Sequence, residues 1–167
     1  MTRYAAAVLT LTLFVLSIHA QDRGASTPQE RAQALRLTRA LESDPLNRDA
    51  SAARRWLTIW IASVPDITVQ VCGAFVKPLM SANKNYSPEI FAQSMFSSAA
   101  FVIEHPDQKD NDEAKYLAGL EGSLRAYESI HKAKPKVQWA LLDELIVKRD
   151  AGELPEYVRA VMPDCTN

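Results

Sequence analysis

Apolar side chains recur along this chain at intervals of three and four residues, the spacing of one face of an α-helix. The pattern is clearest at residues 112–132, where charged positions fill the opposite face. There Glu121 is expected to pair with Arg125, and Glu128 with Lys132, each at i,i+4 spacing. Similar patterns lie at residues 27–43, 46–64, 136–149 and 155–161, and prolines mark the short loops between them. Together with the two segments described next, these patterns predict six or seven helices and an all-α fold.

The stretch 90–103 stands out because it carries no charged side chain. Ser87-Pro88 predicts the start of this helix, since a serine hydroxyl can cap a free N–H and proline fits the first turn. Pro106 predicts its end. The stretch is too short to cross a bilayer. A helix that is apolar on nearly all sides belongs inside a bundle. We therefore expect a central helix at about 88–104, with the other helices packed around it as antiparallel hairpins.

Residues 67–72 show a competing pattern, because their β-branched side chains alternate with others as they do in a β-strand. A single strand would have no partner in a chain that is otherwise predicted to be helical. We therefore expect a third helix here, capped by Asp66 and disturbed at Gly73 and Pro78.

The first twenty residues have the pattern of a secretory signal peptide. Arg3 supplies a positive start, residues 5–18 an apolar stretch, and Ala20 a small residue before the cleavage site. An uncleaved membrane anchor is the alternative, although the apolar run is short for a membrane span. Cleavage would leave a mobile leader at 21–26 and one helical domain at 27–167. We expect this domain to be secreted or periplasmic and free of the membrane.

Two cysteines, Cys72 and Cys165, follow the predicted cleavage site. An even number of cysteines in an exported protein predicts a disulfide, here closing a loop of about 93 residues. Two free thiols or pairing between molecules are the alternatives. The chain has no Cys-x-x-Cys pair, so neither a thioredoxin-like redox site nor a cysteine-based zinc site is indicated.

Charge and motifs exclude several function classes. The chain has 19 basic and 20 acidic residues, a balance that argues against nucleic acid as a partner. It contains no HExxH, GxSxG or phosphate-loop motif. We therefore predict neither a metal site nor a cofactor.

Two pairs of residues are candidates for chemistry on the central helix. His105 and Glu104 lie at its end, where an imidazole beside a carboxylate could act as an acid–base pair. A histidine at a helix C-terminus also has a structural explanation, because its positive form complements the helix dipole. Gln93 and Ser97 could line a small polar pocket, or the serines could allow a neighbouring helix to approach closely.

Trp56 and Trp60 are a further candidate pair, since residues four apart share one face of a helix. Two such rings could stack on a ligand, and they could equally pack in the core.

Two short stretches resemble parts of tetratricopeptide repeats. Residues 39–50, RALESDPLNRDA, resemble the junction between two repeats, and residues 125–135, RAYESIHKAKP, resemble the end of a repeat's second helix. The resemblance implies antiparallel helical hairpins and, by analogy, a protein-binding role.

Two function classes follow. The first is an exported, non-enzymatic binding protein whose partner is a protein or peptide. The alternative is a small, hydrolase-like periplasmic enzyme that would use His105 with Glu104.

Overall fold

The computed structural model describes residues 23–81 and 86–165, and in these ranges it contains helices and no β-strand. The predicted signal peptide and its cleavage site lie outside the described residues. The all-α prediction is confirmed. The elements, in chain order, are α1 (Pro28–Ser43), α2 (Ala50–Ser63), α3 (Gly73–Ser81), α4 (Ser87–Glu104), η1 (Pro106–Gln108), α5 (Asp112–Ala133), α6 (Ala140–Asp150), α7 (Leu154–Val161) and η2 (Met162–Cys165).

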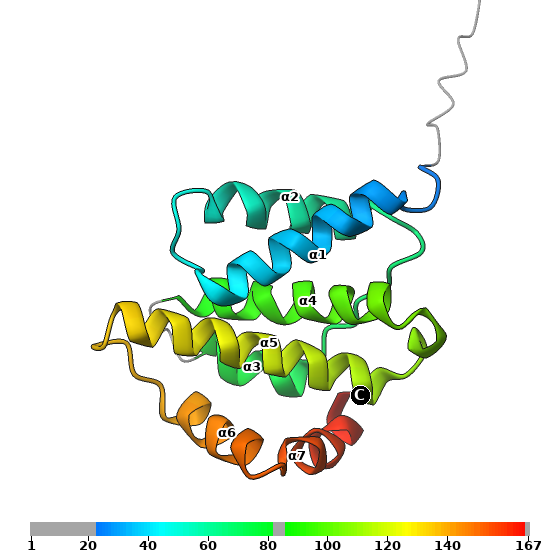
Figure 1. The fold of residues 1–167 in the computed structure, drawn as a ribbon. Helices are drawn as coiled ribbons and strands as arrows, with labels where there is room; N and C mark the ends of the chain where they lie inside the picture. The colour runs from blue at the N-terminus through cyan, green and yellow to red at the C-terminus, as the bar shows by residue number, and fades with distance from the viewer. Residues whose placement is uncertain (1–22, 82–85, 166–167) are drawn as a thin grey trace, which may run out of the picture.

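Helix α4 is central, as its apolar sequence predicts, and it packs against α1, α2, α3 and α5. Its longest contact is with α5, and the two helices lie side by side across the middle of Figure 1. Helices α1 and α2 lie on one side of this pair, and α6 and α7 lie on the other. Two apolar clusters result, one between α4 and the α1–α2 pair and one between α5 and the α6–α7 pair.

Local sequence explains where two of these helices begin and end. The Thr27 hydroxyl accepts a hydrogen bond from the Glu30 backbone N–H at 3.2 Å, and the Glu30 carboxylate accepts one from the Thr27 N–H at 2.8 Å. This capping box satisfies two free N–H groups at the start of α1. Gly152 follows α6 with a φ of 75°, a left-handed conformation that favours glycine.

Small residues bring α4 and α5 into close contact. A Cβ atom added to Gly119 would lie 2.5 Å from the Ser98 Oγ, and one added to Gly122 would lie 1.9 Å from the Ser97 Oγ. The Ser98 hydroxyl also donates to the Lys115 carbonyl of α5 at 2.8 Å. Close packing, one of the two readings of the α4 serines, is therefore confirmed.

The helix predicted at residues 67–72 is wrong, because these residues form neither a helix nor a strand and α3 begins only at Gly73. Ile67 is buried in the α1–α2–α4 cluster, and Cys72 is buried at the start of α3. An extended chain advances about 3.3 Å per residue and a helix only about 1.5 Å. The extended conformation therefore lets this short segment reach from one buried position to the other.

The predicted disulfide between Cys72 and Cys165 is present and joins the start of α3 to η2. Near the other end of the described chain, Ser26 is buried, and its backbone N–H and hydroxyl both donate to the Asp66 carboxylate at 2.7 Å. Ser26 is therefore held against the domain, whereas the sequence places it in a mobile leader. Across the described residues, no helix has the length and apolar character that a membrane crossing requires.

Candidate functional site

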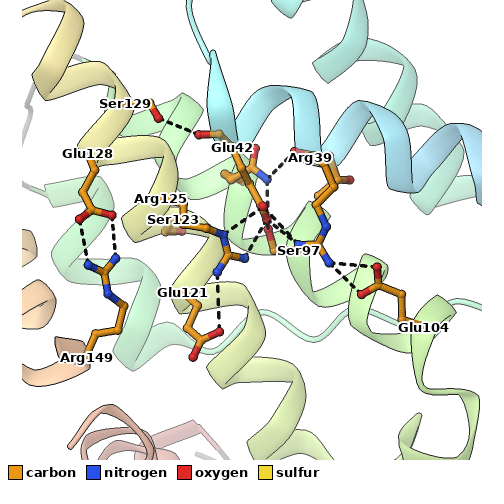
Figure 2. A network of polar contacts seen from close by, with 12 residues as sticks. Arg39, Glu42, Ser97, Glu104, Glu121, Ser123, Arg125, Glu128, Ser129 and Arg149 are labelled. Carbon is orange, nitrogen blue, oxygen red and sulfur yellow. Dashed lines mark hydrogen bonds and ion pairs between the residues drawn. The ribbon is translucent and has the colours of Figure 1, made fainter. Parts of the chain in front are cut away.

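Glu42 is the centre of a buried polar network that joins α1, α4 and α5 (Figure 2). It lies on the buried stripe of α1 with Ala34, Thr38 and Leu41, and it is itself only 6% exposed. A carboxylate in such a position is costly unless charged partners and hydrogen bonds surround it.

The partners of Glu42 come from all three helices. The Arg125 guanidinium on α5 donates to both carboxylate oxygens, each at 3.0 Å. The Ser97 hydroxyl on α4 donates to Oε1 at 2.8 Å, and Arg39 Nη1 on α1 lies 3.2 Å from both oxygens. The Gln93 side-chain amide donates to the Ser97 Oγ at 3.0 Å, so both α4 candidates belong to this network.

The electrostatics of the network keep Glu42 ionised. Burial opposes ionisation, but the hydrogen bonds from Arg125 and Ser97, with the charges of Arg125 and Arg39, outweigh it. The pKa of the Glu42 carboxyl is therefore lowered from its ordinary value.

The surrounding ion pairs leave the network with more carboxylates than guanidinium groups. Figure 2 shows the bidentate pairs between α1 and α4 and between α5 and α6, whose shortest contacts are 2.8 Å and 2.7 Å. The carboxylates are those of Glu42, Glu104, Glu121 and Glu128, and the guanidinium groups are those of Arg39, Arg125 and Arg149. Each guanidinium faces a carboxylate, so the geometry suits a structural link between helices better than an anion-binding site.

The structure does not assemble His105 and Glu104 into an acid–base pair. The Glu104 carboxylate is bound by Arg39, at 2.8 Å and 3.0 Å. The His105 side chain is exposed, and its ring packs on Phe101 with ring centroids 4.7 Å apart. Among the described residues, the His105 ring forms no hydrogen bond to a carboxylate.

Trp56 and Trp60 stack on one another, with ring centroids 5.6 Å apart and planes 10° apart. Trp60 is buried in the α1–α2–α4 cluster, and Trp56 packs against that cluster. Each ring therefore has one face covered by the other ring, as expected of two tryptophans that pack in the core. Trp60 Nε1 is buried and has no hydrogen-bond partner in the described part of the chain.

A partly open apolar cleft lies between α3, α4 and α5, on the side of α4 away from the Glu42 network. Its volume is about 30 Å³, room for a water molecule or a methyl group. Cys72, which forms the disulfide with Cys165, lies in the wall of the cleft. Its large apolar side chains are Val71, Phe75, Phe91, Met95, Tyr116 and Leu120.

Three serines also line this cleft, but their hydroxyls are already engaged. Ser94 donates to the carbonyl of Phe91 at 2.7 Å, Ser98 to that of Lys115 at 2.8 Å, and Ser123 to that of Ile90 at 2.9 Å. Donors committed to main-chain carbonyls are not free for a ligand. The cleft therefore offers a mainly apolar surface that suits an apolar group.

The segment 67–72 reaches the cleft with its last three residues. The side chains of Thr68, Gln70 and Val71 are exposed, and the last two line the cleft as well. Among the described residues, the backbone hydrogen bonds outside the helices include none from residues 67–71. The apolar cleft thus lies beside a segment whose main chain forms none of these backbone hydrogen bonds among the described residues.

Sequence reasoning missed both features as sites. Glu42 was detectable in principle, because it follows Ala34 at helical spacing on the same face as Leu41. No sequence pattern indicates the cleft. It depends on where α3 lies, and the position of α3 depends on the disulfide and on the segment before it.

Within residues 23–81 and 86–165, no group of three or more histidine, cysteine or carboxylate side chains is arranged to hold a metal ion. No family model matches the chain, and searches of curated proteins and of solved structures gave no match.

Proposed function

We propose that this chain is an exported, non-enzymatic binding protein that captures an extended segment of a protein or peptide. The observation that carries the proposal is the apolar cleft beside residues 67–71, which form none of the backbone hydrogen bonds outside the helices among the described residues. The disulfide fits an oxidising compartment, which supports export.

The size of the cleft favours one side chain of a larger partner over a free small molecule. Pockets for small molecules typically enclose about 300–1,000 Å³, whereas this cleft encloses about 30 Å³. A small apolar side chain such as alanine could place its methyl group there. The remaining binding energy would come from contacts around the mouth.

Main-chain pairing can supply those further contacts. Proteins often bind extended peptides by adding them as a strand to an exposed backbone edge, with pockets for alternate side chains. Residues 67–71 form neither helix nor strand, and the exposed Val71 lines the cleft. A peptide lying along this segment would direct one side chain into the cleft and place the next one in solvent.

The enzyme alternative has less support. A hydrolase using His105 would need a carboxylate to orient the imidazole and a pocket for the substrate. Arg39 binds the Glu104 carboxylate, and the His105 ring lies exposed on Phe101. These contacts favour the binding protein.

Selection of peptides from a random phage-displayed library tests the proposal. Val71→Glu places a charge at the mouth of the cleft, and we expect the selected peptides to lose affinity by about tenfold or more. Val147→Glu is the matched control, because Val147 is 68% exposed on α6 and Val71 is 54% exposed. Failure to select any peptide, or equal affinity for wild type and Val71→Glu, would overturn the proposal.

A second variant separates the two function classes. We expect His105→Ala to leave peptide capture unchanged, because His105 lies outside the cleft. A turnover on ester or peptide substrates that disappears in folded His105→Ala protein would instead establish the hydrolase.

A further inference from the structure

Helix α3, which forms one wall of the cleft, has little intrinsic stability. It has nine residues, fewer than an isolated helix needs in water. Pro78 inside it has no backbone N–H, so one helical hydrogen bond is missing. Among those of its side chains that the structure describes, none is fully buried, and Phe75 is only partly buried.

The disulfide compensates for this weakness. Helix α3 packs mainly against α4 and against η2, which lies at the C-terminal end of the described chain. Cys72 precedes α3 and lines the cleft, and Cys165 is the last residue of η2. One covalent bond therefore holds α3, the end of the extended segment and η2 together.

The rest of the fold does not need this bond for its packing. The buried residues of both apolar clusters lie outside α3 and η2, and only the partly buried Phe75 and Met162 of these two elements pack against one cluster. Helices α4 and α5 are joined independently by their close contact and by the Glu42 network. Loss of the disulfide can therefore loosen the cleft wall and leave the α4–α5 pair in place.

We propose that the Cys72–Cys165 disulfide is a redox switch for the cleft, an inference that rests on the proposed function. In the oxidised protein, α3 and residues 67–71 are held on α4 and α5, and the site is ready for a peptide. In the reduced protein, α3 and η2 separate and the site loses its shape. The binding protein would then become active only after oxidation.

The switching reaction is thiol–disulfide exchange with a dithiol. A thiolate of the dithiol attacks Sγ of Cys165, which is more exposed than the buried Cys72. The protein S–S bond breaks, and Cys72 leaves as a thiolate and takes up a proton. The second thiol of the reagent, as its thiolate, then displaces Cys165, which is protonated in turn. The protein gains two electrons and two protons, and the dithiol is oxidised to a disulfide.

Hydrogen exchange followed by mass spectrometry tests the switch without any peptide. Dithiothreitol should accelerate exchange in residues 73–81 and 162–165 by about tenfold or more, while α4 and α5 remain the most protected helices. Unchanged exchange in α3 would overturn the proposal. A uniform acceleration in all helices would overturn it too, because the disulfide would then stabilise the whole fold and not the cleft wall in particular.

Two variants control this experiment. Cys72→Ser/Cys165→Ser should show the loosened pattern from the start and should not respond to dithiothreitol. Leu57→Ala removes a buried side chain in α2 and keeps the disulfide. If Leu57→Ala produced the same local loosening of α3, the effect would come from lower overall stability and the switch would be rejected.

Peptide affinity provides the last step. A peptide selected on the oxidised protein should bind the reduced protein about tenfold more weakly or worse. Equal affinity in both states would reject the switch while leaving the binding function intact. If no peptide is selected at all, the exchange experiment still tests the switch, so the two proposals fail separately.

Discussion

The two sides of α4 pack against their neighbouring helices in different ways. Toward α1 and α5, α4 contributes Gln93 and Ser97 to a network in which the buried Glu42 has partners from three helices. Toward α3, it contributes Ser94 and Ser98 to the wall of a cleft, and their hydroxyls bond to main-chain carbonyls. We call the first side closed because its charged groups are paired with one another, and the second side open because it carries the partly open apolar cleft.

This difference bears on where a partner can bind. A cluster of charged residues in a sequence suggests a catalytic or binding site. In the Glu42 network, however, the charged groups are paired with one another. The cleft side contains fewer polar groups, yet it has a partly open apolar cleft beside a segment that forms neither helix nor strand. The predictions below test whether the closed side carries the stability of the fold and the open side carries little of it.

The largest effect is expected on the closed side, from Gly122→Val. A Cβ atom at this position would lie 1.9 Å from Oγ and 2.4 Å from Cβ of Ser97, and 3.1 Å from Oε1 of Glu42. Helices α4 and α5 would have to move apart, and the network would be disturbed with them. We expect the free energy of unfolding to fall by about 4 kcal/mol or more, measured by urea denaturation.

Gly73→Ala is the matched control for this substitution. A Cβ atom at Gly73, at the start of α3, would meet only the Lys77 side chain, at an ordinary 3.8 Å. We expect a change within about 0.5 kcal/mol. Similar losses at the two glycines would show that the close α4–α5 contact is not special.

The next largest effect is expected from Arg125→Met, which removes the bidentate partner of Glu42. Breaking a buried ion pair leaves an uncompensated charge and typically costs about 3–5 kcal/mol. Only Glu42 is buried in this pair, since Arg125 is 38% exposed, and Arg39 still faces Glu42 at 3.2 Å. We therefore expect about 2–3 kcal/mol, at or below the lower end of that range. Chemical denaturation of the single variants and of Glu42→Gln/Arg125→Met would give the coupling energy between the two side chains.

Arg159→Met serves as the comparison for Arg125. It breaks an ion pair with Glu113 in which both side chains are more than a third exposed. Exposed pairs contribute at most about 1 kcal/mol. An equal loss in the two arginine variants would contradict the view that burial makes the Glu42 network important.

A smaller, pH-dependent effect isolates Glu42 itself. Its pKa in the folded state is lowered from the ordinary value of 4.5, so the ionised form stabilises the fold. This contribution is fully present above pH 4.5 and is lost as the pH falls through the lower folded-state pKa. We therefore expect the stability difference between wild type and Glu42→Gln to shrink as the pH falls below that value. Other carboxyls titrate in both proteins and cancel in this difference, which urea denaturation at a series of pH values measures. A difference that grows on acidification would contradict the sign.

The sequence predicts the interactions that stay within one helix better than those between helices. The predicted i,i+4 pair of Glu121 with Arg125 is present at 3.7 Å. Glu128, expected to pair with Lys132 in the same way, instead binds Arg149 of α6 at 2.7 Å. The first pairing needs only the helical repeat, whereas the second needs the position of another helix.

The same limit applies to the start of α4 and to the candidate site. The helix begins at Ser87, with Tyr86 before it at a φ of 70°, so Ser87 is in the first turn and not at the cap that its sequence suggests. The disulfide follows from the cysteine count, but the cleft depends on residues 67–72 being extended. The local pattern at 67–72 resembles a strand, and a helix is expected there only because a single strand would have no partner. The segment is neither, and both of its ends, Ile67 and Cys72, are buried.

The smallest effect on stability is expected on the open side, from Val71→Ser. Val71 is 54% exposed at the mouth of the cleft, so the folded state gains little by burying it. We expect a change within about 0.5 kcal/mol in urea denaturation, as for other exposed positions. Val147→Ser on α6, where the side chain is 68% exposed, should behave alike. The two variants should differ only in peptide binding, because Val71 lines the cleft and Val147 does not. A loss above about 1.5 kcal/mol for Val71→Ser, approaching the value for a buried valine, would show that Val71 packs as part of the core and would remove the distinction between the two sides of α4.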